Sequence, residues 1–200
     1  MKRARICGGR TSRNVIGDLS ITVIFLSTAV SQTPSPQQVL QQKADRLIAK
    51  GHYLRAAPLV QASLAKNSKD LSALVDESIL QWAFFHQSAF LAAAQRAVSV
   101  DDNSAAAHAQ LANALGQELA NSTSSYITRL SAARQYRKEV DRTLQLDPNN
   151  TDAVQGLAQY QWHAPGIAGG DKEKAQQEVD ILLRSDPERG YVLRAAFAGG

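Results

Sequence analysis

The chain has 200 residues, which is enough for one domain or one short array of repeats. Its 44% hydrophobic and 20% charged residues are typical of a globular protein and exclude an intrinsically disordered chain. The formal net charge of +4 suggests a nucleic-acid-binding protein, but the positions of the charges argue against that class.

The segment 1–31 has the three parts of a secretory signal peptide. Basic residues precede a short apolar run, Leu19 to Val30, which ends in the small-x-small sequence Ala29-Val30-Ser31. We predict a signal peptide over 1–31, cleaved near Ser31-Gln32, and a periplasmic or secreted mature protein. An uncleaved N-terminal anchor is the alternative. Because a bilayer-spanning helix needs about 20 residues, we expect no stable membrane span after cleavage.

The predicted signal peptide carries the excess of basic residues. It holds five of the 22 basic and one of the 18 acidic residues, so 17 of each remain in the mature chain. A mature net charge of zero offers no basic surface for a nucleic-acid backbone, and we expect no nucleic-acid partner. Cys7, the only cysteine, also lies in this segment. The mature fold therefore has neither a disulfide nor a thiolate metal ligand and depends on packing alone.

Four polar boundary segments divide the rest of the chain into alanine-rich helical runs. They are KNSKD at 66–70, VDDNS at 100–104, LDPNN at 146–150 and SDPER at 185–189. The interval from Asn67 to Asp101 is about 34 residues, which is the period of a helical-hairpin repeat. The intervals from Asp101 to Asp147 and from Asp147 to Asp186 are longer, so the later repeats carry insertions.

Residues within these runs resemble the tetratricopeptide-repeat (TPR) family. Gly51, Tyr53 and Ala56 fall on the turn glycine, the turn tyrosine and the small second-helix residue of that family. The pairs Leu111-Ala112 and Leu157-Ala158 match its first-helix Leu-Gly/Ala pair, and Ala175 and Pro187 have its closing separation. Residues 71–104 match least well, because Phe90 replaces a small residue and Asp102 the closing proline.

The resemblance implies an all-α fold, a right-handed superhelical solenoid of antiparallel helix pairs with about four TPR-like repeats. After the signal peptide we expect a linker over 32–39, repeats over 37–189 (37–70, 71–104, 105–150 and 151–189) and a C-terminal partial helix or cap over 190–200. In the third repeat, either the connecting loop is long or both helices are extended; we expect extended helices, with the second beginning near Ser124 or Ser125. An uncapped apolar C-terminal end would permit self-association.

The glycine-rich stretch GIAGGDKEKA, at 166–175, invites comparison with a phosphate-binding loop. No Ser or Thr follows Lys172 or Lys174, and the preceding segment has a helical pattern, so we interpret it as a lengthened turn. An anion site on the backbone N–H groups of this loop stays open. No two histidines stand three or four positions apart, and no catalytic motif occurs. We therefore predict no catalytic residues, metal site or cofactor.

The resemblance also implies a concave groove lined by the first helix of each pair. The candidate groove residues that it assigns are Gln41, Asp45, Val75, Ile79, Trp82, Asn113, Gln155, Gln159 and Trp162. Trp82 and Trp162 fall on the same position of the second and fourth repeats, either as exposed anchors or as filling between repeats. The groove lacks the lysines with which some family members clamp a C-terminal carboxylate.

These features predict a non-catalytic scaffold that binds a protein or peptide partner outside the cytoplasm. The first alternative is an accessory subunit of an envelope transport or assembly complex that binds through its convex face or its end. A more distant alternative is a small-ligand-binding protein or enzyme that uses the 163–171 loop. The sequence does not identify the partner, because fold fixes architecture and not function.

Overall fold

The computed structural model describes residues 34–121 and 125–199. The predicted signal peptide and the first two residues of the predicted linker lie outside them. The described part contains nine α-helices and one short 3-10 turn, and it has no strand. None of the helices in this part is long and apolar enough to cross a bilayer.

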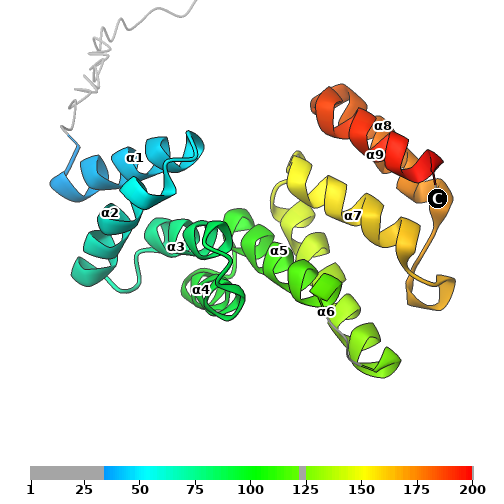
Figure 1. Cartoon of the computed structure of the whole chain (residues 1–200), viewed down its shortest axis with the longest axis horizontal. Coiled ribbons are helices and arrows are strands. Elements are labelled where there is room, and N and C mark those ends of the chain that lie inside the picture. The colour runs from blue at the N-terminus through cyan, green and yellow to red at the C-terminus, as the bar shows by residue number, and fades with distance from the viewer. Residues whose placement is uncertain (1–33, 122–124, 200) are drawn as a thin grey trace, which may run out of the picture. The chain divides into compact units, whose positions relative to one another are not determined.

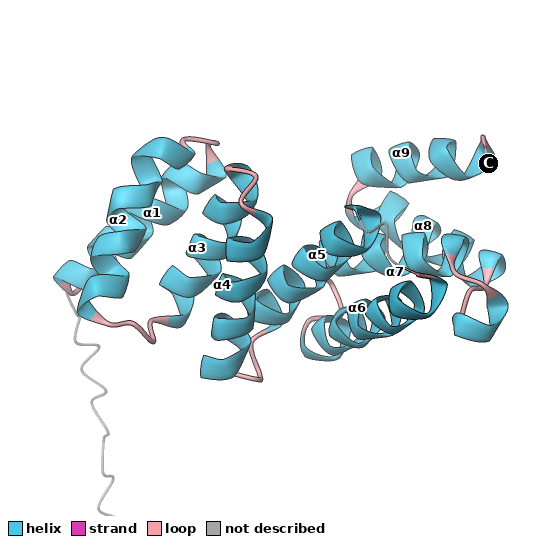
Figure 2. Cartoon of the chain, turned by 60° about the horizontal axis from the view of Figure 1, so that its bottom comes forward, coloured by secondary structure: helices cyan, strands magenta, loops and turns pink. Residues whose placement is uncertain are grey.

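The helices form antiparallel pairs in chain order, followed by one further helix (Figure 1). The pairs are α1 (Pro36–Ala49) with α2 (Tyr53–Lys66), α3 (Leu71–Ala83) with α4 (Gln87–Val100), α5 (Ala105–Asn121) with α6 (Tyr126–Leu146), and α7 (Thr151–His163) with α8 (Lys172–Ser185). The last helix is α9 (Pro187–Ala198), and the 3-10 turn covers Gly166–Ala168. Each helix packs on the next, as the first two pairs show in Figure 2. This is the all-α repeat architecture expected from the sequence.

The polar boundary segments start the helices that follow them. The side chains of Asp70, Ser104, Asn150 and Asp186 each accept a hydrogen bond from a backbone N–H three positions later, at 3.0–3.2 Å. These bonds satisfy donors that the first turn of a helix leaves without partners. The residues that suggested the repeat boundaries are therefore the N-caps of α3, α5, α7 and α9.

The first helix begins earlier than the predicted linker allows. The predicted linker covers 32–39, but Pro36 is already the first residue of α1. Ser35 and Gln38 form a capping box: the Ser35 hydroxyl accepts from Gln38 N, and the Gln38 side chain accepts from Ser35 N. Proline suits the first helical position because its missing N–H has no helical partner there. Pro36 therefore marks a helix start, and the prediction that the linker continues over 36–39 was wrong.

Small residues lie where helices cross. Ala56, Ala158 and Ala175, all assigned from the family pattern, are fully buried. Phe90, which stands where the family has a small residue, is only 1% exposed and packs with Leu111 and Leu115 of α5. The second repeat therefore fills this crossing with one large ring instead of close backbone contact.

The two helices of the third repeat are extended, as expected: α5 has 17 residues and α6 has 21. The N-cap of α6 is Ser125, whose hydroxyl accepts from Thr128 N. Tyr136 of α6 lies between Gly116 of α5 and Gly156 of α7. A Cβ at Gly116 would lie 3.1 Å from the Tyr136 ring, and one at Gly156 would lie 2.5 Å from its hydroxyl oxygen. Both glycines therefore make room for one ring.

Candidate functional site

The first helices of the pairs form a continuous row. Helix α1 contacts α3, α3 contacts α5, and α5 contacts α7, in addition to the contacts within pairs. We call α1, α3, α5 and α7 the first-helix row. All nine candidate groove residues lie on it. Those on α1 and α3 have different surroundings from those on α5 and α7.

At the N-terminal end of the row, a glutamine joins two carboxyl groups. The Nε2 of Gln41 donates to Asp45 Oδ1 at 2.8 Å and to Asp76 Oδ2 at 2.6 Å. Asp76 is only 7% exposed, and its burial, together with the charge of Asp45, raises its pKa to about 7. In the sequence, the acidic neighbour of Asp76 is Glu77. Its true partners lie one repeat earlier, and only the packing of α1 on α3 brings them together.

Three candidate residues of α3 form an apolar stripe. Val75, Ile79 and Trp82 are spaced four and three positions apart, which places them on one face of the helix. Val75 and Ile79 are half-buried, whereas Trp82 is 46% exposed. An exposed indole presents a large apolar ring with one N–H donor, so the stripe offers an anchor for a partner.

At the C-terminal end of the row, helix α9 contacts two of the candidate groove residues, Trp162 and Gln155. The ring of Trp162 stacks on Phe197 with centroids 4.3 Å apart and planes 2° apart, and the Nζ of Lys172 lies 4.5 Å from the Trp162 centroid. The Oε1 of Gln155 accepts from the Arg189 guanidinium at 3.3 Å. Trp162 and Gln155 therefore contribute to the packing of α9 on α7.

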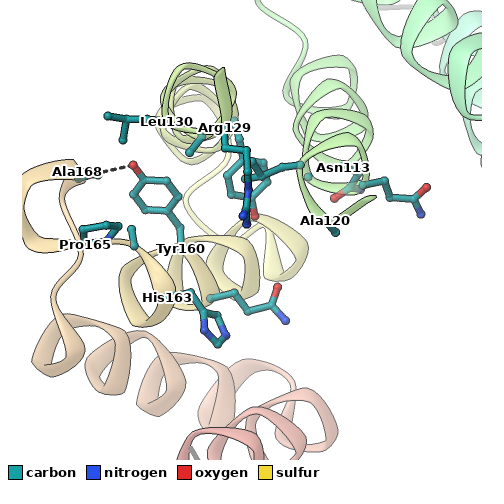
Figure 3. A pocket seen from close by; sticks show the side chains of 15 residues that line it. Asn113, Ala120, Arg129, Leu130, Tyr160, His163, Pro165 and Ala168 are labelled. Carbon is teal, nitrogen blue, oxygen red and sulfur yellow. Dashed lines mark hydrogen bonds between the residues drawn. The ribbon is translucent and has the colours of Figure 1, made fainter. Parts of the chain in front are cut away.

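The other two C-terminal candidates, Asn113 and Gln159, line a pocket between α5, α6, α7 and the loop after α7 (Figure 3). The pocket has a volume of about 640 Å³. Its walls are mostly apolar and include Leu119, Leu130 and Ala133. The sequence predicted the two amides at this site but not the pocket, because its far wall comes from another helix, α6.

Two tyrosines form the aromatic wall of the pocket. The rings of Tyr136 and Tyr160 are 6.1 Å apart and tilted by 31°. The Tyr160 hydroxyl donates to the carbonyl oxygen of Ala168 at 2.6 Å, which fixes the loop against α7 (Figure 3). Burial raises the pKa of Tyr136 to about 12, so its phenol is neutral at physiological pH.

Three backbone N–H groups of the 163–171 loop already donate hydrogen bonds to nearby carbonyl groups. The N–H groups of Gly169, Gly170 and Asp171 donate to the carbonyl oxygens of Gly166, Pro165 and Gln161. The Asp171 carboxylate caps α8 by accepting from Lys174 N at 3.0 Å, and this hydrogen bond lowers the pKa of Asp171. A carboxylate therefore already occupies the helix N-terminus, which argues against the anion site that the sequence left open there.

His108 has a side chain that could bind a metal or transfer a proton, but in this fold it joins helices. His108 is buried and its Nδ1 lies 2.6 Å from Glu139 Oε2, while its Nε2 lies 3.0 Å from the Asp102 carbonyl oxygen. These contacts tie α5 to α6 and to the preceding turn. Within residues 34–121 and 125–199, no group of three or more His, Cys, Asp or Glu side chains is placed to hold a metal ion.

Comparison with known proteins supports the fold. No protein-family model matches the sequence, and no curated protein matches it. Among solved structures, a mutant of the O-GlcNAc transferase from Thermobaculum terrenum aligns with a TM-score of 0.59 and 18% identity. The alignment covers 74% of this chain and 26% of the transferase. The MamA RS-1 ArsTM double mutant aligns with a TM-score of 0.49 and 14% identity over 80% of this chain and 76% of that one.

The chain therefore corresponds to only about a quarter of the transferase. At 18% identity, the likeness to its structure shows the fold alone. That fold is a TPR-like helical-repeat solenoid.

Proposed function

We propose that this protein is a non-catalytic scaffold that binds a segment of a partner protein along the first-helix row, outside the cytoplasm. The observation that carries the proposal is the apolar stripe of α3, which ends in the exposed Trp82. Helical repeats present such side chains on a rigid frame, so a segment binds without reorganising the fold. The export part of the proposal rests on the signal-peptide pattern of residues 1–31.

The neighbouring residues specify the chemistry of the segment. Asp45 is exposed and makes no ion pair with any residue in the described part of the chain. It is joined through Gln41 to Asp76 of α3, the helix that carries the stripe. A segment with a large apolar side chain near a basic residue would complement both features.

The test is capture of a partner from native envelope extract by the immobilised full chain. The Trp82→Ala variant should lose the partner, and the Leu54→Ala variant should keep it. Leu54 is a suitable control because it is 82% exposed and lies on α2, outside the first-helix row. Trp162 should be left intact, because removing its ring would undo the packing of α9.

Equal capture by the parent and both variants would contradict binding at the α3 stripe. That result would favour the alternative of an accessory subunit that binds through its convex face or its end. Circular dichroism of each variant is needed first, to show that its helical content equals that of the parent.

A further inference from the structure

The pocket between α5, α6 and α7 has the size and lining of a small-molecule site. Ligand pockets in proteins commonly have volumes of about 300–1,000 Å³, with mostly apolar walls and a few polar groups. This one has about 640 Å³, leucine and alanine walls and two tyrosine rings. It is confined to the third and fourth repeats and does not include the α3 stripe.

The charge at the pocket is positive. Arg129 is the only formally charged side chain among the residues that line it, and none of them carries a carboxylate. Arg129 makes no ion pair with any residue that the structure describes. Figure 3 shows it extending from α6 into the space between Tyr160 and Asn113. Arg129 is exposed in the unliganded fold, so a ligand that fills the pocket beside it would displace water and strengthen the contact between guanidinium and anion.

Three amide side chains supply further hydrogen-bonding groups. Asn113 and Gln117 of α5 and Gln159 of α7 line the pocket, and none has a side-chain hydrogen bond to another described residue. Their amide groups are thus available to a ligand as donors and acceptors. A single arginine matches one negative charge, which disfavours nucleotides and other polyanions.

We infer that this pocket binds a small organic anion with an apolar, aromatic body, and that Arg129 contacts the anionic group while the tyrosines and leucines surround the body. This function goes beyond the proposed scaffold function and is independent of it. The distant alternative from the sequence used the 163–171 loop itself. Here that loop supplies only one wall of the pocket, through Ala164, Pro165 and Ala168.

The experiment is a calorimetric titration of the full-length protein with each of three probes. The probes are 2-naphthoate, its neutral analogue 2-naphthamide, and acetate. We expect saturable binding of 2-naphthoate, about tenfold weaker binding of 2-naphthamide because a charge-assisted hydrogen bond is lost, and no detectable binding of acetate, which lacks the apolar body.

Three variants locate the binding. Arg129→Gln should reduce 2-naphthoate affinity to that of 2-naphthamide and leave 2-naphthamide unchanged. Arg134→Gln is the matched control, because Arg134 is exposed on the same helix and does not line the pocket. Ala133→Phe should prevent binding of both aromatic probes by filling the pocket, with circular dichroism confirming that the variant stays helical.

The inference is overturned if neither aromatic probe saturates, if the two bind equally well, or if Arg134→Gln weakens binding as much as Arg129→Gln does. It is also overturned if a folded Ala133→Phe variant binds both probes normally. Trp82→Ala should leave 2-naphthoate binding unchanged, so failure of the scaffold proposal and failure of this one are separable.

Discussion

Trp82 and Trp162 occupy the same position in the second and fourth repeats, yet their surroundings differ. Trp82 is 46% exposed, whereas Trp162 is stacked on Phe197 of α9. The helix that follows each pair causes the difference. Helix α9 places the Phe197 ring on Trp162, whereas α5 has no Phe, Tyr or Trp that could stack on Trp82. Equivalent positions in two repeats thus place a side chain on the same face of its helix. The helix of the following repeat determines whether that side chain is buried or exposed.

The two ends of the first-helix row also differ in charge. Its N-terminal end holds the linked carboxyl groups of Asp45 and Asp76. Its C-terminal half borders a pocket that carries Arg129 and no carboxylate. The lengthened α6 contributes to this contrast, because Arg129 lies in its extended N-terminal part.

The largest effect is expected from Gly190→Ala. A Cβ at Gly190 would lie 2.7 Å from the backbone nitrogen of Leu183 and 2.9 Å from its Cα, and backbone cannot move aside cheaply. We expect α9 to separate from α8 at a cost of about 3 kcal/mol, which would expose Trp162 as Trp82 is exposed. Hydrogen exchange over 187–198 and a red shift of tryptophan fluorescence would measure this. Gly199→Ala is the control, because its nearest contact is 3.9 Å; unchanged exchange in the Gly190 variant would contradict the prediction.

The next effect is a pH dependence that Asp76 contributes in the N-terminal half. Because the pKa of Asp76 is about 7 in the fold, against an ordinary 3.8, folding takes up a proton between these values. The contribution of Asp76 to stability should be greatest below pH 4, fall as the pH rises to 7 and stay constant above it. Asp76→Asn should abolish this fall and stabilise the protein at pH 8 by about 2 kcal/mol.

Urea unfolding of the parent and the Asp76→Asn variant at several pH values would measure this effect. Asp180→Asn is the control, because Asp180 is exposed on α8 and pairs only with Arg194 among the described residues. A parent stability that is flat from pH 4 to 7 would contradict the assigned proton uptake.

A smaller effect tests the packing of Tyr136 in the C-terminal half. Gly156→Ala should destabilise the protein by about 1–2 kcal/mol, because the new Cβ collides with the Tyr136 hydroxyl. In a Tyr136→Phe background the nearest atom would be the ring carbon at 3.5 Å, so the same change should become neutral or stabilising through higher helix propensity. A double-mutant cycle by thermal unfolding measures the coupling; additive effects would contradict the contact.

The smallest effect concerns two equivalent turns in the N-terminal half. Gly51 and Phe85 hold the same turn position in the first and second repeats, and both have left-handed backbones, with φ of 71° and 59°. Phe85 is 93% exposed, so Phe85→Gly removes strain with little loss of packing and should stabilise by about 0.5–1 kcal/mol. Gly51→Ala should destabilise by about 1 kcal/mol through strain alone, since nothing lies within 4 Å of the added Cβ. Effects of equal sign in urea unfolding would refute this interpretation.

Much of the fold could be predicted because its determinants are local. The N-caps Asp70, Asn150 and Asp186 act on backbone groups three positions away, and the buried alanines recur with the repeat. Less of the candidate site could be predicted. The pairing of Asp76 with Gln41 and the position of Tyr136 between two glycines both join residues from different helices.

By itself, the sequence determined that the chain folds into paired helices, where most of them begin, and that the third repeat is longer than the others. Those properties follow from capping, periodicity and residue size within one or two turns of helix. Only the tertiary structure decided that Trp82 is exposed, that Trp162 is covered and that a pocket with one arginine lies in the third and fourth repeats. The physical reason is that exposure and cavities depend on which neighbour fills the space beside a helix, and that neighbour comes from another repeat.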